Sequence, residues 1–242
     1  MSEVIIESHD GWAEVILNRP ATRNAINGPL GIALAESFRE VDADDAVNVV
    51  LFRGAQGAFC SGLDLKAFNA EPAPDWLADF QSIWRGAHKA IFDCRKPIVG
   101  ALERYAINGG AALALAADLL IAGENAFLQV GEVQQGMAAP YNLAWLRLHH
   151  SQALANQIAL IGRRFPGSEL KSLGIATDTA ADDQVLEAAA ALAQQLADYP
   201  PGALARIKTG LRRYGPASAD EWFDLAASPD SPGVKAPRAV DR

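Results

Sequence analysis

The 242-residue sequence has only two cysteines and two methionines, and it has no long uninterrupted apolar run. Cys60 and Cys94 are not part of a C-x-x-C arrangement, so we expect two free thiols in a reducing cytoplasm. No apolar segment approaches the length that crosses a bilayer. The first ten residues lack the basic and apolar segments of a secretory signal. The sequence therefore predicts a cytoplasmic protein that does not use a membrane.

Basic charge is also scarce, because 21 lysines and arginines face 29 aspartates and glutamates, a net charge of −8. This balance argues against a general affinity for nucleic acid or for an anionic membrane, whereas a small anionic ligand remains possible. The four histidines show no metal-ligand or catalytic-triad spacing. G-x-S-x-G, G-x-G-x-x-G, Walker and H-E-x-x-H motifs are absent. We therefore expect neither a metal nor a redox cofactor.

Half of the residues are hydrophobic, and the chain is long enough to bury a sizeable core. Apolar residues that alternate or run together predict strands, and apolar residues at three- and four-residue steps predict helices. The order strand, helix, strand indicates a layered α/β core. The expected strands are residues 4–7, 12–17, 47–52, 97–102, 119–122 and 173–176, and the expected helices are 29–42, 76–94, 111–117, two within 141–162, 186–199, 203–214 and 219–227.

Two loops share one plan, in which a buried strand leads through an irregular turn and a glycine into a helix. The first loop spans residues 54–66 and contains Ser61 before Gly62, and the second reaches Gly109-Gly110. A glycine lets another molecule approach the backbone closely, and the first N–H groups of a helix lack intrahelical partners. We expect two backbone N–H groups to converge here, with the carboxylate of Glu132 as a possible proton carrier nearby.

Five segments in order resemble the crotonase (enoyl-CoA hydratase/isomerase) superfamily. They cover nearly the whole chain, so the resemblance is stronger than any one segment alone. These segments are L-N-R-P-A-T-R-N-A-I (17–26), G-A-F-C-S-G-L-D-L (57–65), the block 105–136, R-R-F-P-G-S-E-L-K-S-L-G-I-A (163–176) and S-P-D-S-P-G-V-K-A (228–236).

The resemblance implies a spiral of β-β-α repeats over residues 1–185, with the acyl-CoA site, and a C-terminal helical region, 186–242, that packs subunits into trimers or dimers of trimers. It implies an acyl-CoA thioester as the small-molecule partner, with coenzyme A belonging to the substrate rather than acting as a separate cofactor. It also implies that the backbone N–H groups of Ser61 and Gly109 hold the thioester oxygen. Such donors stabilise the enolate that forms when a proton leaves the neighbouring carbon.

One position departs from the family pattern in a way that bears on the reaction. Family hydratases resemble one another in carrying two glutamates, of which the second matches Glu132 and the first falls on Ala112. A methyl group cannot activate water, so the resemblance favours double-bond isomerisation in which Glu132 moves a proton between two carbons. A hydratase, a related hydrolase or lyase, and an acyl-CoA binder with weak turnover remain alternatives.

The remaining interpretations concern binding and packing. The resemblance implies coenzyme A contacts at Arg23, Ala25, Leu63, Lys66 and Lys235, although exposed charge alone explains the basic ones equally well. Asn108 stands where the family has a glycine, and residues 139–142 replace a glycine-rich stretch, which predicts a narrower acyl pocket. We expect Asp64 to cap the helix that begins at Leu65, Cys60 to be a buried thiol and Tyr141 to be a packed aromatic residue rather than a proton donor. Glu103 and Arg104 form an internal ion pair or point into the cavity.

Overall fold

A computed structural model describes residues 2–215 and 218–226. Its main sheet has six strands in the order β1-β2-β3-β4-β6-β9. The first two strands form an antiparallel hairpin, and the other neighbours pair in parallel. The strands are β1 (Val4–Ser8), β2 (Trp12–Leu17), β3 (Val49–Gly54), β4 (Ile98–Leu102), β6 (Leu119–Gly123) and β9 (Asp178–Ala180).

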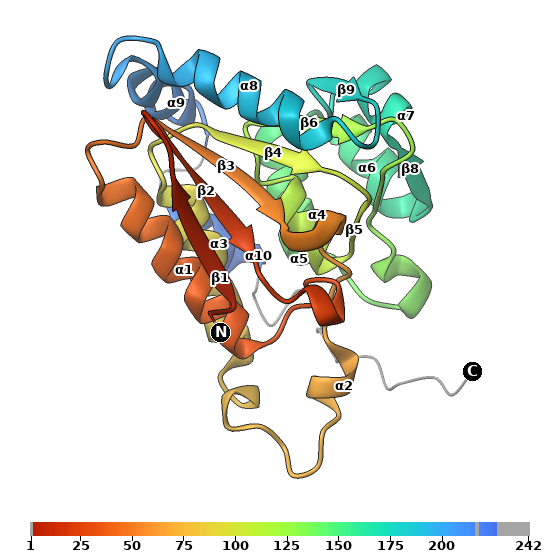
Figure 1. The fold of residues 1–242 in the computed structure, drawn as a ribbon. Helices are drawn as coiled ribbons and strands as arrows, with labels where there is room; N and C mark the ends of the chain where they lie inside the picture. Colours follow the sequence, from red (N-terminus) through yellow and green to blue (C-terminus); the bar gives the residue numbers. More distant parts are fainter. Residues whose placement is uncertain (1, 216–217, 227–242) are drawn as a thin grey trace.

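Helices cover both faces of this sheet, which explains why the central strands β3, β4 and β6 are apolar except for Arg53. Val50 and Phe52 of β3 pack into the larger core cluster, with residues of α1 (Gly28–Ala43) and α3 (Phe80–Asp93). Leu51 faces the opposite way, into a second cluster with α8 (Val185–Ala197). Figure 1 shows α8 across one face of the sheet, with α1 and α3 on the other.

A second, smaller sheet alternates with the main one along the chain, as a spiral of repeated turns requires. It consists of β5 (Tyr105–Ile107), β7 (Phe127–Gln129) and β8 (Arg164–Pro166). Two isolated parallel bridges, between Cys60 and Ala106 and between Ile26 and Leu63, continue its pairing toward the N-terminal part of the chain. Segments that are distant in sequence are thereby aligned at the edge of the core.

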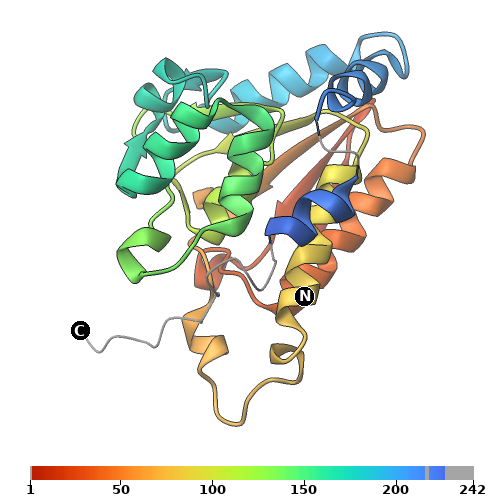
Figure 2. The ribbon, with the colours of Figure 1, turned by 180° about the vertical axis from the view of Figure 1, so that it is seen from behind.

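The remaining helices surround this smaller sheet and the end of the main one. Figure 2 shows α10 beside α3, and α10 also packs on α5. No helix in the described part of the chain is long and apolar enough to cross a membrane. These helices are α2 (Leu65–Phe68), α4 (Gly109–Ala114), α5 (Pro140–His149), α6 (Gln152–Ile161), α7 (Gly167–Ser172), α9 (Ala203–Arg212) and α10 (Ala219–Ala226).

The strand expected at residues 173–176 is wrong. Residues 173–177 are turns and bends that follow α7, and the pairing strand is β9, which begins at Asp178. The N–H groups of Ile175 and Ala176 both donate to the Leu170 carbonyl oxygen, which turns the chain back on α7. The apolar run reflects burial of Ile175 and Ala176 (7% and 3% exposed), not extended pairing.

The expected spiral α/β fold is confirmed in its mixed sheets and helices. The helix expected over 111–117 begins two residues earlier, at Gly109, and the one expected over 76–94 divides into a short 3₁₀ turn (Asp75–Leu77) and α3. The division at residue 185 and the assembly of subunits remain predictions. The expected contact of Lys235 and the whole fifth family segment (228–236) lie outside the described residues.

Candidate active site

The two glycine loops lie against each other in the structure. The Cys60 N–H donates to the Tyr105 carbonyl oxygen (3.2 Å), and the Ile107 N–H donates back to the Cys60 carbonyl oxygen (3.1 Å). This short parallel pairing carries Ser61 alongside the chain that leads into α4. The two loops therefore lie side by side, as their common plan predicts, and the convergence of the Ser61 and Gly109 N–H groups stays a prediction.

Glycine is required where the loops touch. A Cβ on Gly110 would lie 2.6 Å from the Cys60 carbonyl oxygen, and one on Gly62 would lie 3.0 Å from the Ile107 carbonyl oxygen. Gly62 also has a φ of +90°, a conformation that other residues rarely adopt. The close approach of the loops thus depends on the absence of side chains at these two positions.

The two N–H groups expected to hold an oxyanion have different surroundings. Gly109 is the first residue of α4, and its N–H has no acceptor within the described part of the chain. The Ser61 N–H donates to the Arg23 carbonyl oxygen at 3.1 Å. A thioester oxygen at Ser61 would therefore have to share or displace this contact.

Glu132 is buried beside these loops, although it lies at the start of a polar 3₁₀ turn (Glu132–Gln135). Its side chain is 7% exposed, and burial raises its pKa from 4.5 to about 7. Hydrogen bonds from its own backbone N–H and from Asn142 oppose this rise. A carboxyl group with a pKa near neutrality can both accept and return a proton.

Asn142 and Asn108 connect the carboxylate to the Gly109 loop. The Asn142 side-chain amide donates to Glu132 Oε1 (2.9 Å) and to the Asn108 carbonyl oxygen (3.1 Å). The Asn108 side-chain oxygen accepts from the Gly131 N–H (2.9 Å), and the Asn108 N–H donates to the Gln129 carbonyl oxygen (2.8 Å). The acid and the residue before Gly109 are therefore held in one network.

Asn108 supports this network from an uncommon backbone conformation, with φ of 53° and ψ of −116°. Positive φ is favourable for glycine and costs other residues free energy. This conformation would suit a glycine, and Asn108 holds it with several hydrogen bonds.

Aromatic side chains pack close to Gly109. A Cβ on Gly109 would lie 3.9 Å from the Trp84 ring, and that ring meets the imidazole of His88 edge to face (4.7 Å between centroids). His88 stacks on Tyr141 at 4.4 Å, and burial raises the pKa of Tyr141 to about 12. Tyr141 is thus a packed aromatic residue, as expected.

His88 is fully buried, and burial lowers its pKa to about 3. Its Nδ1 accepts from the Trp145 indole N–H (2.9 Å), so Nε2 carries the proton of the neutral ring. That Nε2 has no partner, and neither do Glu132 Oε2 and Asn142 Oδ1. These three are the unsatisfied buried side-chain atoms of the described chain, and they occur around the start of α5.

Ala112 lies within α4, and no solvent reaches it (0% exposed). No ionisable side chain is present anywhere in this helix, whose sequence is GGAALA. The helix that supplies Gly109 therefore offers no second carboxylate.

Three of the residues expected to contact coenzyme A lie together. The Ile26 N–H donates to the Gly62 carbonyl oxygen (2.8 Å), so the chain at Ala25 runs beside Leu63. Arg23 is exposed on the same segment, and its carbonyl oxygen contacts Ser61. Lys66 lies on α2, exposed to solvent.

Asp64 caps α2 as expected, because its side chain accepts from the Ala67 N–H (3.0 Å). It also pairs with Arg19 at 2.9 Å. Cys60 is confirmed as a buried thiol, and desolvation raises its pKa to about 12. A thiol with this pKa is not a nucleophile at neutral pH.

Of the two alternatives for Glu103 and Arg104, the internal ion pair is absent from the ion pairs of the described residues. Both residues line a separate cavity of about 620 Å³, together with Gln56, Phe127 and Asp182. Another cavity, of about 650 Å³, lies beneath α9, where Lys208 pairs with Asp118 at 2.6 Å. Neither cavity includes Glu132.

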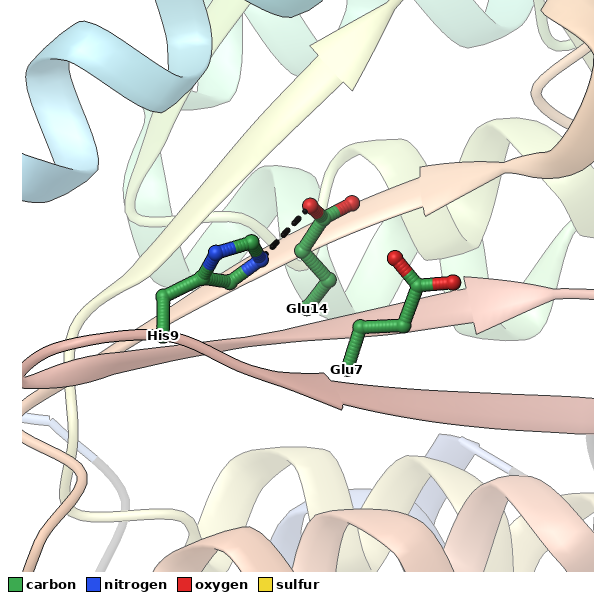
Figure 3. Close-up of side chains that lie close together, drawn as sticks. All are labelled: Glu7, His9 and Glu14. Carbon is green, nitrogen blue, oxygen red and sulfur yellow. Dashed lines mark hydrogen bonds and ion pairs between the residues drawn. The ribbon is translucent and has the colours of Figure 1, made fainter.

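The β1–β2 hairpin brings Glu7, His9 and Glu14 together on one face of the sheet (Figure 3), with ligand atoms within 4.8 Å of one another. Both oxygens of Glu14 are already used, because Oε1 contacts His9 Nε2 (2.9 Å) and Oε2 pairs with Arg53. The positive charge of Arg53 also opposes a cation here. We interpret this cluster as a charge network of the sheet rather than as a metal site.

The family model for enoyl-CoA hydratase/isomerase matches residues 7–221. The carnitinyl-CoA dehydratase of Proteus mirabilis (strain HI4320) is 34% identical over 218 residues, which cover 89% of this chain and 82% of that protein. The carnitinyl-CoA dehydratase of Salmonella enteritidis PT4 (strain P125109) is 33% identical over 227 residues, 92% of this chain and 85% of that protein.

Solved structures show the same fold. An enoyl-CoA hydratase/carnithine racemase from Magnetospirillum magneticum superimposes with a TM-score of 0.80 at 28% identity, covering 95% of this chain and 90% of that one. An enoyl-CoA hydratase from Mycobacterium tuberculosis H37Rv has a TM-score of 0.74 at 30% identity, covering 97% and 92%. The chain belongs to the enoyl-CoA hydratase/isomerase family, and it is therefore a crotonase-family enzyme of acyl-CoA chemistry.

The roles of Asn142, Trp84 and His88 were not expected from the sequence. Trp84 and His88 follow an ordinary helical periodicity, which indicates only that they face a core. Asn142 belongs to the stretch 139–142, which departs from the glycine-rich segment that the family resemblance implies. That departure was the one feature of the sequence that pointed to this residue. Its contact with Glu132 depends on how α5 packs.

Proposed function

We propose that this protein isomerises the double bond of an enoyl-CoA thioester, with Glu132 as the proton carrier. Glu132 takes a proton from the carbon next to the thioester carbonyl and returns it two carbons away. The negative charge of the intermediate enolate lies on the thioester oxygen, to which the backbone N–H groups of Ser61 and Gly109 donate hydrogen bonds. Arg23, Ala25, Leu63 and Lys66 contact the coenzyme A part of the substrate.

The observation that carries this proposal is the state of Glu132, a single buried carboxyl group beside the Gly109 loop with a pKa raised to about 7. Near neutral pH such a group is populated in both protonation states, so it can act as base and then as acid. Ala112 offers no second carboxylate for water. A 1,3 proton shift needs one such group.

A second candidate is hydration or dehydration of the same class of thioester. It is favoured by the 33–34% identity to proteins named carnitinyl-CoA dehydratase. In that reaction Glu132 would exchange its proton with water, and a partner other than residue 112 would hold the oxygen.

Absorbance of the conjugated thioester distinguishes these reactions. With a 3-enoyl-CoA, isomerisation makes the absorbance grow; with a 2-enoyl-CoA, hydration makes it decay. We expect growth with the first. Decay with the second and no growth with the first would replace the proposal by hydration, and no change with either would leave a binding protein.

Substitution of Glu132 by glutamine tests the assigned proton carrier. Because general acid–base catalysis contributes roughly 10²–10⁴-fold, we expect Glu132→Gln to lower kcat by that order while the protein still binds the thioester. Glu103→Gln is the matched control, since Glu103 is a half-buried carboxyl whose pKa burial also raises, and it lines a cavity that does not include Glu132. Equal turnover of Glu132→Gln and the unaltered protein would remove Glu132 from the mechanism.

A further inference from the structure

Asn142 is the one side chain that donates a hydrogen bond to the carboxylate of Glu132 in the described chain. It is 2% exposed and lies in the first turns of α5. Both hydrogens of its amide are used, one by Glu132 Oε1 and one by the Asn108 carbonyl oxygen. Its orientation is fixed, because a flipped amide would turn an oxygen toward both of these acceptors.

The consequence is that the two oxygens of Glu132 are not equivalent. Oε1 is held by Asn142, whereas Oε2 is buried with no partner. Buried acceptors without a donor are rare in proteins, and a catalytic role is one of the reasons for which they are kept. Oε2 is therefore the oxygen available to exchange a proton with a bound molecule.

The same amide sets the distance between the acid and the oxyanion loop. Asn108, whose carbonyl oxygen it binds, immediately precedes Gly109. The reciprocal bond from the Gly131 N–H to Asn108 Oδ1 ties the residue before Glu132 to the same loop. Movement of either loop alone would break these contacts.

We propose that Asn142 is a positioning residue that clamps Glu132 Oε1 to the Gly109 loop and dedicates Oε2 to proton transfer. This inference rests on the proposed function of Glu132. It gives α5, through Asn142, a part in positioning the proton carrier. The helix α4 supplies no carboxylate to this step, because residue 112 is an alanine.

The clamp also tunes the acid. A donor to a carboxylate favours its charged form, so Asn142 holds the pKa of Glu132 below the value that burial alone would give. No other side chain competes with this effect: α4 and α6 carry no ionisable residue, and Tyr141, Arg147 and His149 of α5 do not contribute.

The test compares pH profiles of kcat/KM for Asn142→Leu and Asn142→Asp. Asn142→Leu removes a hydrogen bond to the charged form of Glu132. We therefore expect the apparent pKa of the acidic limb to be higher in this variant by about one to two pH units. In Asn142→Asp this apparent pKa should be higher still, since the new carboxylate places an acceptor instead of a donor against Glu132 Oε1. Gln134→Ala is the control. Gln134 lies in the same 3₁₀ turn as Glu132, but its side-chain amide donates to the Gly162 carbonyl oxygen and not to Glu132.

A titration of the unaltered protein by NMR covers the case in which these variants fail to fold. The side-chain amide protons of Asn142 should shift with the pKa of Glu132, and this response should vanish in Glu132→Gln. The inference is overturned if the Asn142 amide does not respond, or if Gln134→Ala moves the pH profile as far as Asn142→Leu does. The NMR response does not require turnover, so it tests this inference even if Glu132→Gln leaves turnover unchanged and the proposed function fails.

Discussion

Glu132 is an acid on which burial and hydrogen bonding act in opposite directions. Burial dominates, so its pKa in the folded protein is about 7 instead of 4.5. Between these two values the folded protein holds a proton that the unfolded chain has released. The stability that this bound proton contributes to the folded protein is therefore lost as pH rises from about 4.5 to about 7. The proton carrier lowers the stability of the fold at the pH at which it works.

This linkage predicts how Glu132→Gln changes stability. Glutamine cannot ionise, so the variant escapes the loss that the unaltered protein suffers between about pH 4.5 and 7. The variant's free energy of unfolding relative to the unaltered protein should increase from pH 4 to pH 8 by on the order of 3 kcal/mol. Urea unfolding at both pH values measures the difference, and a difference that stays constant with pH would show that the pKa of Glu132 is not raised.

At this scale the sequence predicted Glu132, Ser61 and Gly109 as a group, because each stands at a recognisable place in a loop. Their catalytic roles remain predictions. The hydrogen bond of the Ser61 N–H to the Arg23 carbonyl oxygen was not foreseen. It depends on the left-handed turn at Arg23 (φ 57°), which the sequence does not specify.

Among the elements, the short helix α4 depends most on close contact. Gly110 lies in it with Cys60 atoms at 2.6–2.8 Å from any added Cβ. The carbonyl oxygen and the buried side chain of Cys60 cannot move away easily to make room for a Cβ at Gly110. The position of α4, and with it the Gly109 N–H, is set by this contact.

Gly110→Ala should therefore destabilise the fold by roughly 1–3 kcal/mol, the usual cost of overpacking, and should lower activity by displacing Gly109. Gly86→Ala is the matched control, because a Cβ there meets nothing within 4 Å and α3 should gain up to about 1 kcal/mol in helix propensity. Thermal unfolding and turnover of both variants measure this. A Gly110→Ala protein as stable and active as Gly86→Ala would contradict the account.

Long elements were predicted better than short ones. The β-branched run 47–52 and the periodic helices at 29–42 and 186–199 appear close to their expected places, because each repeats its pattern over several turns or pairs. The three-residue strands β5, β7 and β8 were missed, since three residues carry no measurable period. The apolar run 173–176 was misassigned, because burial alone does not distinguish a strand from a turn packed on a helix.

For the whole molecule, the spiral topology is what brings distant segments together. The segments around Arg23, Ser61, Gly109 and Glu132 belong to successive turns of the chain. The bridges Ile26–Leu63 and Cys60–Ala106 align the first three, and the pairing of β5 with β7 aligns the fourth. The family resemblance made this arrangement predictable. The fit of α5 against it was not, because the stretch that begins α5 departs from the family pattern.

The most direct test of the account is a crystal structure of the protein with a bound acyl-CoA thioester. The account predicts the thioester oxygen within hydrogen-bond distance of the Ser61 and Gly109 nitrogens, with Glu132 Oε2 facing the neighbouring carbons and Oε1 still on Asn142. A thioester oxygen bound elsewhere, with the Ser61 N–H still donating to Arg23 and Glu132 directed away from the acyl chain, would contradict it.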